Sequence, residues 1–480
     1  MSSVSEVINY TAPTDIETYL GVKLLVFDPP TDEEIMQTYL PDMWVETKRG
    51  KHINENVFAR AFRDVNNLRY NNGLFYTRNG KRTEEILSRE IWESIADEEI
   101  GITQNVAQIV TRLMNAVKLA STVPALKTDE DVIPFANGDF HLRGWEFHLG
   151  EFSPTAYRLP VPLMPSLRDT PYFMKWLRDL FYEDDIKLIQ EYLGYCLVCT
   201  TKAQKALFLV GEGGAGKSGI GVILQALLGD AEINIANTQE FLQDKFRLAE
   251  LEHKLVIYDD DLDSSALTDT GLYKKLITNT LNITADRKYG QPFKFRPEAK
   301  LVACCNQMLS SARDTTEGFY RRLLPVIIKP IAPDFRPDPR FYDHLAEEAS
   351  GIAQWSLMGL CRLVENNWIL SESDRTKAYL AQKRSIENPM GDFMASVFEF
   401  GDQFPGVTTA DILRVYEVWC RRNRVTAWKD RTVQQWLSDN SEKYGIAPSS
   451  HITDGDRQVR GYKNLSIKME WSERGKISLI

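Results

Sequence analysis

The sequence predicts a multidomain α/β protein. The chain has 480 residues, which corresponds to about three domains of roughly 150 residues each. Between residues 203 and 330, apolar runs of strand length alternate with stretches of helical periodicity, as is typical of an α/β domain. Residues 131–163 instead combine glycine, proline and aromatic residues, which indicates short strands and turns. A composition with 43% hydrophobic and 26% charged residues excludes a disordered or fibrous chain.

The other elements follow from periodicity and from helix-breaking residues. Residues 1–60 show no clear pattern, whereas residues 84–123 and 168–200 show helical spacing. A proline-punctuated stretch follows residue 329, and helices are expected from there to about residue 385. These patterns divide the chain into five parts. They are an N-terminal domain (residues 1–165), a helical collar (166–202), an α/β core (203–335), a helical connector (336–385) and a C-terminal module (386–480).

Charge and cysteine usage limit the class of protein. The formal charge is −10, which argues against a small basic protein that coats nucleic acid but leaves room for a local basic groove. Residues 1–40 contain seven acidic residues and one lysine, whereas residues 421–480 contain twelve basic and seven acidic residues. Six cysteines are too few for a disulfide scaffold. With neither a signal peptide nor a membrane-spanning run recognised, we expect a cytoplasmic protein without a membrane partner.

The strongest motif is the sequence GEGGAGKS, which has the GxxxxGK[ST] pattern of a phosphate-binding loop. It follows an apolar strand at residues 207–210 and precedes an apolar helix that ends near Gly229. Glycines let backbone N–H groups turn toward phosphate oxygens, and the helix N-terminus adds partial positive charge. The alternative is a glycine-rich turn that matches by chance. The predicted nucleotide-binding residues are Gly211, Gly213, Gly214, Ala215, Gly216, Lys217, which reaches the β- and γ-phosphates, and Ser218, which ligates Mg²⁺.

Two later strands end in polar side chains. The apolar strand near residue 256 ends in Asp259, Asp260 and Asp261, as expected for a Walker B element in which one acid holds Mg²⁺ and the next polarises water. The sequence leaves open, by one position, which two of the three aspartates form the Walker B pair. The alternative is that the aspartates simply form a solvated end of the strand. The strand at residues 300–305 ends in Asn306, which could orient the lytic water or simply end the strand in a turn.

Basic residues follow in two places. Arg287, Lys288 and Tyr289 lie at the expected tip of a strand–turn–strand segment, where they suit contact with a single nucleic-acid strand. A solvated surface hairpin explains the same pattern equally well. Arg321 and Arg322 precede an apolar strand and are candidates for an arginine finger that reaches the nucleotide of a neighbouring subunit. An intramolecular salt bridge is the alternative for these arginines.

This order of motifs resembles that of the superfamily 3 helicases, which are AAA+ ring ATPases of viruses, phages and plasmids. LRYNNGLFY at residues 68–76 and IPFANG at residues 133–138 look like the N-terminal region of the poxvirus-type and phage-satellite-type primase-helicases. Tyr192-Leu-Gly-Tyr195 followed by Gln204 looks like the helical collar before their phosphate loop. The resemblance covers roughly residues 60–480 and implies a central AAA+ core.

The resemblance implies an ATP hydrolase, specifically a replicative DNA helicase of a phage, plasmid or mobile element in the host cytoplasm. A homo-oligomer, expected to be a hexameric ring, would move 3′ to 5′ on single-stranded DNA and open a forked duplex, with ATP and Mg²⁺ required. The resemblance pairs Asp260, a metal-binding acid, with Asp259 or Asp261, and it favours Arg322 over Arg321 as the finger. It makes Asn306 the sensor and places Lys288 and Tyr289 at the DNA-binding tip.

The N-terminus departs from the family pattern. Residues 1–60 are too short for the primase domain of many relatives, so we predict no primase activity and consider a separate primase or initiator as a partner. Residues 386–480 predict two helices and a hairpin with a positive bias, which suggests a winged-helix-like module for duplex DNA or for packing. Two other functions are a non-processive AAA+ switch, such as an initiator, loader or defence ATPase, and a binding module with a degenerate nucleotide site.

Overall fold

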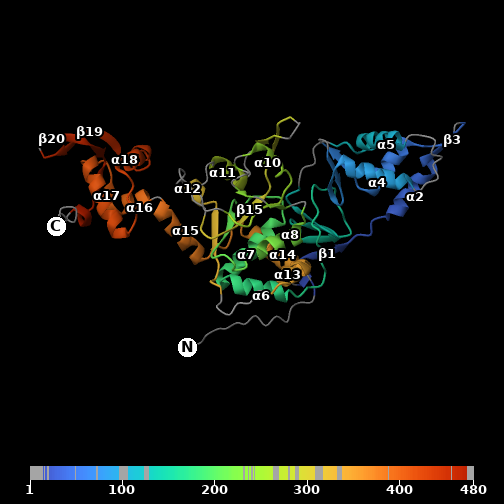
Figure 1. The fold of residues 1–480 in the computed structure, drawn as a ribbon, viewed down its shortest axis with the longest axis horizontal. Helices are drawn as coiled ribbons and strands as arrows, with labels where there is room; N and C mark the ends of the chain where they lie inside the picture. Colours follow the sequence, from blue (N-terminus) through green and yellow to red (C-terminus); the bar gives the residue numbers. More distant parts are fainter. Residues whose placement is uncertain are drawn as a thin grey trace, which may run out of the picture. The chain divides into compact units, whose positions relative to one another are not determined.

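The computed structural model confirms a mixed α/β protein built from several sheets and many helices (Figure 1). It divides into two compact units, Met1–Ala312 with Arg321–Thr376, and Arg313–Tyr320 with Lys377–Ile480. No helix in the described part of the chain is long and apolar enough to cross a membrane. The structure describes residues 15, 17–18, 21–48, 50–71, 74–96, 106–123, 129–230, 233–235, 237–238, 242, 244–262, 270–278, 282–286, 291–308, 317–331, 338–387, 389–455 and 457–472.

The N-terminal part of the first unit is a helical cluster with short hairpins. Its helix α2 begins with a capping box, in which Thr31 and Glu34 each bond the other's backbone N–H. Helices α3, α4 and α5 pack through one apolar core that includes the stacked rings of Phe58 and Phe62. The elements are α2 (Asp32–Met43), β2 (Trp44–Thr47), β3 (Gly50–Ile53), α3 (Glu55–Val65), β4 (Arg69–Asn71), β5 (Leu74–Thr77), β6 (Gly80–Arg82), α4 (Glu84–Ala96) and α5 (Val106–Ser121).

The glycine- and proline-rich stretch forms a small sheet, as its composition predicts. Strands β7 (Val132–Phe135), β8 (Gly138–His141) and β9 (Glu146–Leu149) are antiparallel neighbours. The early strand β1 (Lys23–Val26) joins this sheet parallel to β9. Residues 21–26, which carry no clear sequence pattern, are therefore ordered by pairing with a segment more than a hundred positions further along the chain.

The predicted collar consists of α6 (Pro171–Leu180) and α7 (Glu183–Cys196), and α7 crosses α14 (Ala349–Glu365) closely. A Cβ on Gly194 would lie 2.3 Å from the Ser356 carbonyl oxygen, and one on Gly359 would lie 2.2 Å from the Gln190 carbonyl oxygen. Glycine in both helices therefore permits this crossing.

The central sheet of the first unit is five-stranded and entirely parallel. Its order is β11-β12-β15-β10-β16, and its strands are β10 (Ala206–Val210), β11 (Ile233–Ile235), β12 (Val256–Asp259), β15 (Lys300–Cys305) and β16 (Leu323–Ile327). Helices cover a sheet of this kind on its faces, so its strands are nearly all apolar and buried. The associated helices are α8 (Gly219–Leu228), α10 (Lys245–Ala249), α11 (Thr270–Thr278) and α13 (Phe341–Glu347).

Strand β15 lies between β10 and β12, so three parallel strands carry the predicted site motifs side by side. The connection from β12 to β15 includes the antiparallel strands β13 (Ile283–Ala285) and β14 (Phe293–Phe295). These two strands confirm the two strands of the predicted strand–turn–strand segment. Its tip, with Arg287, Lys288 and Tyr289, lies outside the described residues.

A buried lysine opens β15. Lys300 is 1% exposed, and its Nζ donates hydrogen bonds to the carbonyl oxygens of Val198 and of Glu298, the latter at 3.4 Å. Nζ also lies 5.5 Å from the centre of the Tyr195 ring. Burial lowers the pKa of Lys300 from 10.5 to about 8, because water no longer stabilises the charge.

This shifted pKa predicts a specific pH dependence of stability. The unfolded chain keeps the Lys300 proton up to pH 10.5, whereas the folded chain releases it near pH 8, so stability rises with pH between these values. We expect the wild-type chain to gain about 2 kcal/mol relative to Lys300→Met between about pH 7.5 and about pH 9.5. Denaturant unfolding at the two pH values measures this gain. The exposed Lys187 provides the control, because Lys187→Met keeps Lys300 and its stability should rise with pH in parallel with wild type. Parallel behaviour of Lys300→Met and wild type would contradict the buried-lysine argument.

The second unit has its own apolar core. Thr408 caps α17 by accepting a hydrogen bond from the Asp411 backbone N–H at 3.0 Å. The expected helix–helix–hairpin order is confirmed, while contact with duplex DNA stays a prediction. The elements are α12 (Glu317–Tyr320), α15 (Asp374–Glu387, shared with the first unit), α16 (Pro389–Val397), β17 (Phe398–Phe400), β18 (Val407–Thr408), α17 (Thr409–Asn423), α18 (Asp430–Asp439), β19 (Ala447–Asp454), β20 (Arg457–Lys463), β21 (Leu465–Ile467) and α19 (Met469–Ser472).

Candidate nucleotide-binding site

The glycine-rich loop joins β10 to α8 and has the backbone of a phosphate cradle. Gly214 and Gly216 have φ values of +79° and +90°, which residues other than glycine rarely adopt. Around Gly213 no atom of the described residues lies within 4 Å of an added Cβ. Gly211, in contrast, packs against Ile328, whose Cγ1 would lie 2.2 Å from a Cβ. The loop is therefore held at its start and open at its middle, where a phosphate would enter.

Lys217 folds back over the loop. Its Nζ donates hydrogen bonds to the carbonyl oxygens of Gly211 at 2.6 Å and Glu212 at 2.8 Å, and to Asn306 Oδ1 at 3.5 Å. The residue is only 8% exposed. The ammonium group thus connects the phosphate loop with the end of β15, as expected if both act on one ligand.

The first turn of α8 is packed against aromatic rings from two other elements. The Trp176 Nε1–H donates to the Gly216 carbonyl oxygen at 3.0 Å, and a Cβ on Gly219 would lie 2.5 Å from the same nitrogen. A Cβ on Gly221 would lie 2.3 Å from the Tyr258 ring. Ser218, directly before the helix, lines the cleft together with Ala215. These contacts fix the helix N-terminus against the loop.

The three aspartates separate into one buried and two exposed residues. Asp259 is 4% exposed, and its Oδ2 accepts the backbone N–H of Thr238 at 2.7 Å. Burial raises the pKa of Asp259. Asp260 and Asp261 are exposed and line the cleft, and the Tyr258 hydroxyl donates to Asp260 Oδ1. The arrangement therefore places Asp260 and Asp261 at the cleft and turns Asp259 away from it.

These residues enclose a cleft of about 620 Å³, within the range of about 300–1,000 Å³ usual for ligand pockets. The loop, the two aspartates and Asn306 contribute polar groups to this cleft. The segments at α6 and α13 contribute Trp176, Leu180, Phe341 and Tyr342, which we call the aromatic side, together with the charged residues Lys175, Asp179 and Asp338. Polar groups and aromatic rings in one cleft suit a nucleotide, and carboxylates beside a serine hydroxyl suit Mg²⁺.

The aromatic side is the part of the cleft that motif analysis missed. Tyr172, also in the lining, stacks on His344 with ring centres 4.3 Å apart. Helices α6 and α13 flank the core in sequence, before the phosphate loop and after β16. The only available signals were the aromatic clusters PYFMKW and RFYDH, which equally suit a helix core.

The two arginines differ in exposure. Arg321 is exposed, whereas Arg322 is 8% exposed. The backbone carbonyl of Arg322 accepts the Ala206 N–H at 2.8 Å, where β16 pairs with the start of β10. The Arg322 charge partly opposes the rise in the Tyr273 pKa that burial causes. Of the pair, Arg321 is the one whose side chain is open to a neighbouring molecule.

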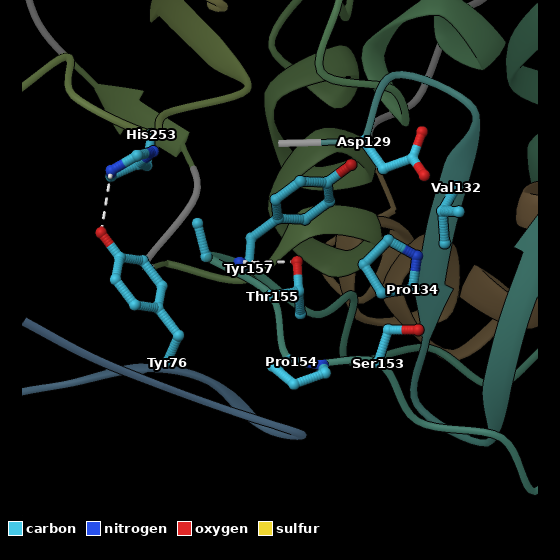
Figure 2. A pocket seen from close by; sticks show the side chains of 10 residues that line it. Tyr76, Asp129, Val132, Pro134, Ser153, Pro154, Thr155, Tyr157 and His253 are labelled. Carbon is cyan, nitrogen blue, oxygen red and sulfur yellow. Dashed lines mark hydrogen bonds between the residues drawn. The ribbon is translucent and has the colours of Figure 1, made fainter. Parts of the chain in front are cut away.

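A second hollow of about 90 Å³ is too small for a nucleotide (Figure 2). Figure 2 shows the Tyr76 hydroxyl directed at His253 Nε2, at a distance of 3.5 Å. Ser153, Thr155 and Tyr157 line the same hollow. Its volume suits a few water molecules at most.

Comparisons with known proteins agree with the fold. A model of a family of unknown function (DUF5906) matches residues 209–322, which hold the loop, the aspartates, Asn306 and both arginines. No curated protein matches the chain. The apo structure of the NrS-1 C-terminal region (305–718) is 12% identical, with a TM-score of 0.50, covering 91% of this chain and 100% of that chain. Its A form is 14% identical, with a TM-score of 0.47, covering 82% of this chain and 88% of that one. At this identity, the likeness to the first of these structures shows a shared fold.

Proposed function

We propose that the chain is an ATP hydrolase that drives movement on DNA, a replicative helicase of the AAA+ superfamily 3 type. The observation that carries the proposal is the convergence of Lys217, Asn306, Asp260 and Asp261 on one cleft. These groups come from three neighbouring parallel strands and serve distinct roles in phosphoryl transfer. Ser218 and the aspartates would hold Mg²⁺, which would supply positive charge to neutralise the charge that develops on the phosphates.

Within this proposal each group has a defined task. Lys217 exchanges its carbonyl partners for phosphate oxygens, one exposed aspartate holds Mg²⁺, and the other polarises water. Asn306 orients that water from the end of β15. Arg321, rather than the buried Arg322, serves as the finger that reaches a neighbouring subunit in a hexameric ring.

The hairpin of β13 and β14 supports the DNA part of the proposal. Ile283, Ala285 and Phe295 are buried at its base, so the hairpin is anchored in the core, while Lys294 is exposed. Its tip carries Arg287, Lys288 and Tyr289, which could bind the backbone and bases of a single strand. The proposed movement is 3′ to 5′.

The test separates hydrolysis from unwinding. Single-stranded DNA should stimulate ATP hydrolysis, and the protein should open duplexes with a 3′ tail but not a 5′ tail. Lys288→Ala should abolish unwinding and leave basal hydrolysis unchanged, because Lys288 is not among the residues proposed to bind or hydrolyse the nucleotide. Lys294→Ala, on the same hairpin away from its tip, is the matched control and should retain both activities.

Other outcomes would assign another function. Intact hydrolysis without strand separation on either tail would contradict the helicase proposal. Equal effects of Lys288→Ala on both activities would favour a non-processive ATPase switch, such as an initiator or loader. No robust turnover at all would indicate a binding module.

A further inference from the structure

A cluster of metal-binding side chains lies on the hairpin of β8 and β9, outside the nucleotide cleft. The hairpin register pairs His141 with Glu146, so His148, two residues further on, lies on the same face as His141. The two imidazole ring centres are 4.0 Å apart. The His148 Nδ1 forms a hydrogen bond with Glu151 Oε2, and His141 Nε2 lies 3.6 Å from the same oxygen. One donor atom from each of these three residues lies within 4.8 Å of the other two.

The local backbone brings Glu151 to the two histidines. Gly150 has a φ of +87°, and a Cβ there would lie 2.3 Å from the Phe27 carbonyl oxygen. The Glu151 N–H then donates to the His148 carbonyl oxygen at 3.3 Å, which closes a tight turn. Only glycine fits this position, and the turn directs the carboxylate back over the hairpin.

One of the three potential metal-ligand atoms has no hydrogen-bond partner among the described residues. His141 Nε2 is buried, and it makes no hydrogen bond to any residue that the structure describes. A buried polar atom without a partner costs free energy, which coordination to an ion would recover. The atom is directed at the same carboxylate oxygen that His148 contacts.

We propose that His141, His148 and Glu151 bind a divalent transition-metal ion, Zn²⁺ in the first instance. Two imidazole nitrogens and one carboxylate form a donor set that Zn²⁺ takes readily, with water or another ligand in the fourth position. Mg²⁺ prefers oxygen ligands in octahedral geometry and so would not compete here. The proposal is independent of the ATPase function.

Surrounding residues support the histidine orientation that such a site needs. The second ring nitrogen of His148, Nε2, lies 3.2 Å from Glu146 Oε2. Glu146 Oε1 in turn accepts a hydrogen bond from Lys23 Nζ of β1 at 3.2 Å. Metal-binding histidines usually donate their other N–H to a carboxylate in this way, which fixes the ring and its tautomer. A bound ion would therefore link the β8–β9 hairpin, the Gly150 turn and, through Glu146, strand β1.

The test titrates the full-length chain, stripped by a chelator, with Zn²⁺ alone and with Co²⁺ alone. We expect one ion per chain, with the Co²⁺ form showing visible absorption of a low-coordinate nitrogen–oxygen site. His141→Gln and Glu151→Gln should each weaken binding at least tenfold, and Glu146→Gln should weaken it about 10- to 100-fold through the His148 ring. His451→Gln, which removes an exposed histidine of the second unit, is the matched control and should bind like wild type.

Two results would overturn the proposal. One is the absence of stoichiometric binding to the wild-type chain at micromolar Zn²⁺. The other is unchanged affinity in Glu151→Gln, a substitution that keeps the size of this partly exposed side chain. Thermal unfolding of the metal-free variants checks that each one folds, and Zn²⁺ should raise the melting temperature of wild type but not of His141→Gln.

Discussion

Lys217→Ala is expected to lower ATP turnover by about 10³-fold, because it removes the only ammonium group that reaches both the phosphate loop and Asn306 in the described cleft. Phosphate release under saturating ATP and Mg²⁺ measures the loss. Nucleotide affinity should fall as well, since in the proposed function the lysine would contact phosphate oxygens in the ground state and in the transition state.

The matched control is Lys187→Ala, which removes an exposed lysine of α7. It should retain wild-type turnover, which would show that the loss is specific to the cleft and not a general effect of charge. Turnover of Lys217→Ala within tenfold of wild type would contradict the assignment of the loop as the catalytic nucleotide site.

The second large effect distinguishes between the three aspartates. Asp260→Asn and Asp261→Asn should each lower turnover by about 10²–10³-fold, because each removes a carboxylate that lines the cleft and that, in the proposed function, would serve Mg²⁺ or the attacking water. Asp259→Asn should retain most activity, since an amide oxygen can still accept the Thr238 N–H. Turnover measured across a range of Mg²⁺ concentrations identifies the metal-binding member, because its loss should raise the Mg²⁺ requirement.

The Asp259 variant provides both the control and the contradicting outcome. It is the same chemical change as the other two substitutions, made at a buried side chain instead of at an exposed one that lines the cleft. A severe loss of turnover in Asp259→Asn, together with normal turnover in Asp261→Asn, would show that Asp259 and not Asp261 belongs to the catalytic acidic pair. The sequence allows that pairing, while the exposure of the three side chains argues against it.

The parts of the site that sequence predicts are local. The loop at residues 211–218 combines strand, glycines and helix in one short segment, so its conformation depends mainly on its own residues. The choice between Asp259 and Asp261 is different, because it depends on where β12 stops and how the chain turns. No residue type marks that point in a run of three identical side chains.

Features formed by distant segments could not be predicted in the same way. The aromatic side of the cleft needs α6 and α13 to pack on the core, and clusters of aromatic residues alone are more often simple core. The His141 and His148 pair depends on a hairpin register that a shift of one residue would destroy. The pairing of β1 with β9 likewise joins segments far apart in the chain, and residues 21–26 alone carry no signal for it.

The contacts of Lys217 have a consequence for ligand discrimination. The ammonium group already bonds two carbonyl oxygens and an amide oxygen. An anion therefore binds only to the extent that its interaction with the ammonium group is more favourable than these three hydrogen bonds. A single weakly held phosphate offers little advantage in this exchange, whereas a chelated triphosphate presents several oxygens at once. In the proposed function, ligand specificity would therefore depend on the free-energy difference between the ligand-free loop, in which Lys217 bonds protein oxygens, and the loop with bound phosphates.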